Sequence, residues 1–151
     1  MFQISIRIRM TFSKLVKEFS SKPRRLFLID GLGAILSAFL LGVVLVQLEY
    51  LFGVPRSTLY FLAFLPCLFA LYDLYCYQRV NENLSFHLKV IACFNILYCG
   101  ISIGLACFHY QKITYLVWVY FVIEVIIVIA IAKLELKVAA NISNQENDKK
   151  V

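Results

Sequence analysis

Charged side chains are scarce in this sequence. Only 16% of its 151 residues are Asp, Glu, Lys or Arg, whereas 62% are hydrophobic. Soluble domains carry roughly a quarter charged residues, and a soluble domain of this length cannot hide so much apolar surface from water. The composition therefore excludes an ordinary soluble domain and indicates a protein whose solvent is the lipid bilayer.

The motifs of common metal and catalytic sites are also absent. The five cysteines form no CxxC pair, so they are interpreted as small apolar packing residues. His87 and His109 are about 33 Å apart along one predicted helix, too far to bind one metal ion or haem within a subunit. No phosphate-binding loop or nucleophile elbow occurs. We therefore expect no metal, no cofactor and no catalytic constellation.

Most of the chain consists of long apolar blocks. A bilayer core of roughly 30 Å needs about 20 helical residues to cross it. The blocks do not alternate as the strands of a membrane barrel do, and a helix satisfies its own backbone hydrogen bonds in lipid. The sequence predicts an all-α, polytopic transmembrane four-helix bundle over residues 26–138. Its predicted spans are residues 26–48, 57–78, 85–108 and 114–136.

The basic residues are distributed unequally between the two ends of these spans. Thirteen of the fifteen Lys and Arg residues fall in the N-terminal segment, the second connection and the C-terminal tail, or in the span ends next to these segments. The positive-inside rule places these segments, and so both termini, in the cytoplasm. We therefore expect a multi-pass membrane protein with these segments on the cytoplasmic side. Topology and contact with anionic lipids explain the net charge of +6 better than nucleic-acid binding does.

The two ends of the chain are predicted to lie outside the bundle. Residues 1–25 form a basic segment in which Phe12, Val16 and Phe19 follow helical spacing, which predicts a short amphipathic helix on the membrane surface. The residues before Met10 alternate as a strand would, and translation from either Met1 or Met10 is compatible with the sequence. Residues 139–151 are polar, which predicts a disordered tail.

Small residues are expected to hold the spans together, because helices in lipid do not associate through the hydrophobic effect. Gly33 and Ser37 lie four residues apart in the first span, and Gly100 and Gly104 form a GxxxG pair in the third. These positions predict the central packing faces of the bundle.

Glu124 and Asn95 form the first candidate polar site. Both lie near the middle of their predicted spans, where a charged side chain is costly and is a functional hypothesis by default. A hydrogen bond between them would satisfy both groups, and loss of water favours a protonated carboxyl. The pair is either structural glue between helices or a proton-binding site for coupled transport.

A second polar cluster is predicted toward the cytoplasmic side. Asp30 and Asp73 lie at a similar depth in antiparallel spans, and Lys89 and Tyr77 approach the same level. The cluster is either an ion-paired network or the rim of a small-ligand pocket. Two nearby carboxyl groups can also share a proton or a cation.

Three stretches carry a resemblance to known proteins. They are LFLIDGLGAILSAFLLGVVL at residues 26–45, FGVPRSTLYFLA at Phe52–Ala63 and IEVIIVI at Ile123–Ile129. They resemble a family of small uncharacterised membrane proteins of Bacteroidota-type bacteria. The resemblance implies an inner-membrane protein with four spans, and it implies no activity or catalytic residue.

Three functions remain open from the sequence. The first is a structural or accessory membrane protein, whose partners are membrane lipids and either a second copy of the chain or another membrane protein. The second is a small oligomeric proton-coupled transporter that uses Glu124. The third is a membrane enzyme that acts on lipid or quinone.

Overall fold

The computed structural model describes residues 2–80, 83–111 and 113–148. Within these residues every regular element is a helix, and no strand is present. In chain order the elements are α1 (Phe2–Ser21), α2 (Arg24–Phe39), the π-helical segment η1 (Leu40–Leu45), α3 (Glu49–Phe52), α4 (Arg56–Arg79), α5 (Leu84–Phe108) and α6 (Tyr115–Asp148).

Four of the helical segments in the described part of the chain are long and apolar enough to cross a membrane. Each overlaps one of the four spans expected from the sequence, and they are Arg24–Leu45, Arg56–Arg79, Leu84–Phe108 and Tyr115–Glu146. The last extends to Glu146, beyond the predicted end at residue 136. Large apolar side chains such as Leu32, Phe64 and Ile126 are exposed on their outer faces. An apolar exterior of this kind suits a lipid environment.

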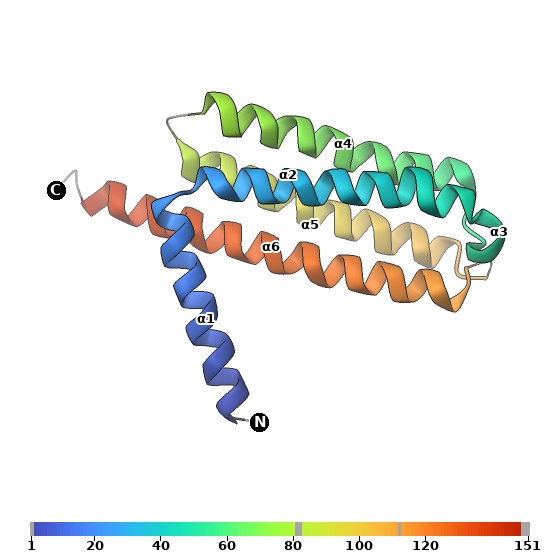
Figure 1. Ribbon diagram of the computed structural model, residues 1–151, viewed down its shortest axis with the longest axis horizontal. Coiled ribbons are helices and arrows are strands. Elements are labelled where there is room, and N and C mark those ends of the chain that lie inside the picture. The colour runs from blue at the N-terminus through green and yellow to red at the C-terminus, as the bar shows by residue number, and fades with distance from the viewer. Residues whose placement is uncertain (1, 81–82, 112, 149–151) are drawn as a thin grey trace.

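The long helices lie side by side as two hairpins (Figure 1). We call residues 24–79 the first hairpin, in which α2 and η1 pack against α4, and residues 84–148 the second hairpin, in which α5 packs against α6. Close backbone contacts are abundant within each hairpin and much rarer between them. The two hairpins are joined mainly through side chains, which form two buried apolar clusters with members from both hairpins.

Two glycines allow the close approach of α2 and η1 to α4. A Cβ atom added at Gly31 would lie 3.1 Å from the Cβ atom of Asp73, and one added at Gly42 would lie 3.2 Å from that of Ala63. An added Cβ at Gly33, Gly100 or Gly104 would meet no atom within 4 Å. The structure thus places close helix contacts at Gly42, which belongs to the predicted small-residue face of the first span, and at Gly31, and it places none at Gly33, Gly100 or Gly104.

The connection between the first two spans is a short turn with its own helix. The α3 helix ends at Gly53, whose φ of 73° is in the left-handed region that favours glycine. Pro55 follows and precedes the first residue of α4, where its fixed φ suits a helix start. The side chain of Arg56 donates a hydrogen bond to Glu49 across this turn.

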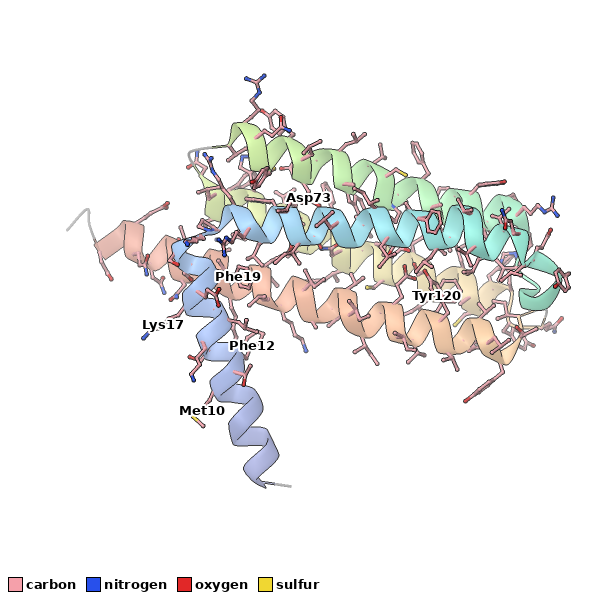
Figure 2. All side chains as sticks on the ribbon, in the orientation of Figure 1. Met10, Phe12, Lys17, Phe19, Asp73 and Tyr120 are labelled. Atoms are coloured by element: carbon pink, nitrogen blue, oxygen red, sulfur yellow. The ribbon has the colours of Figure 1, made fainter. Side chains whose placement is uncertain are left out.

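The N-terminal helix α1 leaves the other helices at a steep angle (Figure 1). Its C-terminal half is attached to α6: the ammonium group of Lys137 lies 5.2 Å from the centre of the Phe12 ring, and the Asn141 amide donates to Ser20 Oγ at 3.2 Å. Phe19, labelled in Figure 2, packs against a buried apolar cluster that includes Val138.

The two ends of the chain differ from the sequence-based expectation. The strand-like alternation before Met10 lies within α1, which is helical from Phe2 onward. The prediction of a disordered tail is wrong for residues 139–148, because α6 continues to Asp148. The contact of Asn141 with Ser20 of α1 gives the tail segment a partner that its local sequence does not reveal.

Three segments that contain or adjoin basic residues meet at one end of the molecule. The Arg24 guanidinium donates to the backbone oxygen of Val80 at 3.3 Å, and Ser85 Oγ donates to that of Ala139 at 2.8 Å. The α1–α2 junction, the α4–α5 connection and the C-terminal part of α6 are therefore neighbours, as Figure 1 shows at the left. This arrangement agrees with the unequal distribution of Lys and Arg along the sequence.

Candidate functional site

Four polar side chains, one from each long helix, meet in the interior. They are Asp30 of α2, Asp73 of α4, Asn95 of α5 and Glu135 of α6, which we call the carboxyl cluster. All four are buried, with exposed fractions of 5%, 1%, 6% and 0% respectively. Two members come from each hairpin, so the cluster lies across the hairpin interface.

Asn95 is the hydrogen-bond donor of the cluster. Its Nδ2 atom lies 3.0 Å from both carboxyl oxygens of Asp30 and 3.4 Å from Glu135 Oε2. An amide group has two N–H bonds, so it can serve two carboxyl groups at once. Asn95 thereby joins the first hairpin to the second.

The remaining carboxyl oxygens of the cluster have no hydrogen-bond donor. Both oxygens of Asp73 and the Oε1 atom of Glu135 are buried without a hydrogen-bond partner. Asp73 lies close enough to Asp30 for the two carboxyl groups to interact. A hydrogen bond between them requires a proton on one of the two, because an ionised carboxylate can only accept. Among the described residues, no Lys or Arg side chain contacts these carboxyl groups.

The predicted cationic and aromatic members of this group lie elsewhere. Lys89 is exposed on α5. Tyr77 is 38% exposed and lines a groove between α2 and α4, which also contains Asp73. The structure therefore brings Asp30 and Asp73 together as expected, but with Asn95 and Glu135 instead of Lys89.

Glu124 lies in a separate polar contact on α6. Tyr98 Oη and Tyr120 Oη donate to its Oε1 atom at 3.0 Å and 3.3 Å. Its Oε2 atom is buried without a hydrogen-bond partner. The predicted hydrogen bond between Asn95 and Glu124 is wrong, because Asn95 turns to Asp30 and Glu135 instead.

A cavity of about 280 Å³ connects Glu124 with the carboxyl cluster. Asp30 and Asn95 line one part of it, and Glu124 lines another. Glu124 and Glu135 are eleven residues apart on α6, or about 16 Å along the helix axis. The cavity therefore extends along the hairpin interface between two sets of buried carboxyl groups.

A groove of about 470 Å³ lies on the other side of the cluster, between α2 and α4. Gly31 and Asp73 form part of its wall, and Figure 2 shows Asp73 between these two helices. Figure 2 also marks Tyr120, which lines the inner cavity, on α6. The carboxyl cluster thus separates the cavity from the groove.

Glu135 is the site residue that sequence reasoning missed. It lies near the end of the predicted fourth span, where an acidic residue is ordinary. The signal was its helical register: Glu124, Val128, Ile131 and Glu135 follow i, i+4, i+7 and i+11 spacing, which places them on one helix face. The first three line the cavity, and the fourth belongs to the carboxyl cluster.

The chemistry of the cluster follows from its charge. Three ionised carboxylates at short range repel one another strongly where the dielectric constant is low. Bound protons or a bound cation would neutralise them. The described His, Cys, Asp and Glu residues form no group of three that could hold a metal ion.

No protein-family model, curated protein or solved structure matches the chain. The resemblance to Bacteroidota-type membrane proteins therefore stays a prediction. Function must be argued from the site itself.

Proposed function

We propose that this protein is a small proton-coupled carrier of the bacterial cytoplasmic membrane. In this proposal the carboxyl cluster and Glu124 bind and release protons, and these changes are coupled to the movement of a solute through the hairpin interface. The proposal develops the transporter hypothesis, to which it adds Asp30, Asp73 and Glu135 beside Glu124.

One observation carries the proposal: three carboxyl groups converge inside the helices with one amide donor, and no Lys or Arg in the described part of the chain pairs with them. Buried polar groups that only hold helices together are normally paired, because each unpaired group costs free energy. A cluster with unpaired carboxyl oxygens opposes stability and is expected where function requires it. The unpaired oxygens therefore favour a proton-binding site over a purely structural role.

The architecture supports movement at the same place. The backbones of the two hairpins approach each other closely at few positions, and the cavity lies between them. Small rigid-body shifts of one hairpin against the other would alter the surroundings of Asp30 and Glu124 without disturbing either hairpin internally. Such a shift is the simplest way to expose the cavity first to one side and then to the other.

In the proposed topology, four spans form a bundle with both termini in the cytoplasm. Thirteen of the fifteen Lys and Arg residues belong to the segments at one end, as the positive-inside rule requires of the cytoplasmic side. The steep angle of α1 suits a helix that lies along the membrane surface, where its Lys residues would contact anionic lipids. The family resemblance supports the same location.

We also propose a homodimer, because four helices enclose only a narrow path. The outer face of α5 exposes Cys93, Leu97, Gly100 and Gly104. Small residues at four-residue spacing let two helices approach closely in lipid. A second copy of the chain is the proposed occupant of this face.

The decisive experiment is an infrared pH titration of the full chain in lipid nanodiscs. The carboxyl stretching region is compared for the wild type, Glu124→Gln and Glu135→Gln. The matched control is Glu18→Gln, which changes an exposed carboxyl group on α1. We expect protonated-carboxyl bands that titrate reversibly between about pH 5 and 8, and each interior substitution should remove intensity that the control retains.

The opposite result would reject the carrier. If the carboxyl bands that Glu124→Gln and Glu135→Gln remove do not change across this range, these groups are static hydrogen-bonding residues. The structural or accessory protein would then be the better interpretation.

A further inference from the structure

We propose that the cavity between the hairpins binds a small organic cation, with an ammonium group attached to a compact apolar body. The proposal rests on the proposed carrier function for the role of this cation as transported solute. Binding itself is a separate property of the cavity, and it can be tested separately.

The charge of the cavity selects a cation. Glu124 and Asp30 both line it, whereas no Lys, Arg or His side chain does among the described residues. Glu124 is 93% buried, since its exposed fraction is 7%, and its Oε2 atom has no hydrogen-bond partner. An unpaired carboxyl oxygen buried at the wall of this cavity is a ready acceptor for an N–H donor or a counterion for a quaternary ammonium group.

The aromatic residues of the cavity support the same ligand. Phe69, Tyr98 and Tyr120 contribute to its wall. A cation above an aromatic ring is attracted by the ring quadrupole, and the attraction is larger where water is excluded. The hydroxyl groups of both tyrosines already donate to Glu124, so their rings stand beside the carboxyl group.

The remaining wall defines the body of the ligand. Leu36, Leu40, Ile127 and Val128 give the cavity a largely apolar lining. A bare metal ion would find too few oxygen ligands there, and an anion would meet two carboxyl groups. The volume of about 280 Å³ is at the lower end of ligand cavities, which limits the ligand to a small molecule.

The test uses calorimetric titration of the full chain in nanodiscs with phenyltrimethylammonium. Its positive charge does not depend on pH, so protonation of the probe cannot confuse the result. Two probes of similar shape serve as competitors: tert-butylbenzene, which has the same shape without charge, and benzoate, which is an anion. We expect saturable binding of phenyltrimethylammonium that neither competitor displaces.

Two variants locate the binding site. Glu124→Gln removes the carboxylate with almost no change of shape and should weaken binding roughly tenfold or more. Gly33→Leu fills the cavity from α2, where an added Cβ meets no atom within 4 Å, and should also weaken binding. Ala140→Leu is the matched control, because Ala140 is exposed and lies outside the cavity.

The outcomes separate the two proposals. Equal displacement by tert-butylbenzene, or unchanged affinity in both cavity variants, would overturn the cation site. Carboxyl groups that titrate without any phenyltrimethylammonium binding would also overturn it, and they would leave the proton-coupled function standing. Binding that both cavity variants weaken supports the cation site even if the infrared bands do not change with pH. In that case the proton-coupled function is rejected and the cation site stands.

Discussion

Replacing Asp73 with Asn should make the protein more stable. Asp73 is 1% exposed, both of its oxygens lack a hydrogen-bond partner, and it lies beside the Asp30 carboxyl group. Asn has almost the same shape and carries an amide donor that can reach Asp30. The substitution therefore removes the like charge that an ionised Asp73 places beside Asp30, and it provides an N–H donor toward Asp30 that needs no bound proton.

The magnitude follows from the groups involved. Leaving a buried polar group unpaired costs about 1–3 kcal/mol. We expect Asp73→Asn to raise the free energy of unfolding by about 2 kcal/mol, which shifts the ratio of folded to unfolded protein roughly thirtyfold. Glu18→Gln, which changes an exposed carboxyl group, should stay within about 0.5 kcal/mol of the wild type.

The assay is reversible unfolding in mixed micelles at pH 7, with increasing denaturing detergent and helix content followed by circular dichroism. The reasoning requires a higher midpoint for Asp73→Asn than for the wild type and Glu18→Gln. An equal or lower midpoint would show that the Asp73 carboxyl group is already neutral and paired. If Asp73→Asn is more stable and its carboxyl bands no longer change with pH, the destabilisation caused by the cluster is linked to its proton binding.

Three further results are expected. Asn95→Leu should lower the free energy of unfolding by about 3 kcal/mol in the same assay, because two buried carboxyl groups lose their donor; a change below about 1 kcal/mol would contradict the hydrogen bonds described. Gly31→Ala should lower the free energy of unfolding by about 1–3 kcal/mol, because the added methyl group overpacks against α4. Gly33→Ala, where the added methyl group meets no atom, should be neutral or slightly stabilising. Equal effects of the two variants would contradict the close contact of Gly31 with α4. A variant that keeps only Cys93 should form a disulfide-linked dimer on mild oxidation in membranes, and one that keeps only the buried Cys99 should not; cross-linking from neither would argue against α5 as the dimer face.

The sequence determined the long helices and their apolar exteriors. Blocks of about 20 apolar residues leave few alternatives in a bilayer, since each backbone group must find its partner within the segment. It also identified Glu124, Asn95, Asp30 and Asp73 as unusual, because charge and polarity in hydrocarbon are costly wherever they occur. These conclusions depend on local composition, which can be read from the chain without its fold.

The tertiary structure alone decided which of these residues meet. Depth in the membrane suggested that Asn95 pairs with Glu124, but the rotation of α5 and α6 turns Asn95 toward Asp30 and Glu135. Depth fixes a residue along the helix axis only, whereas contacts also depend on the angle at which each helix faces its neighbours. That angle is set by packing between segments distant in the sequence, such as Gly31 against Asp73. It cannot be read from a local sequence pattern.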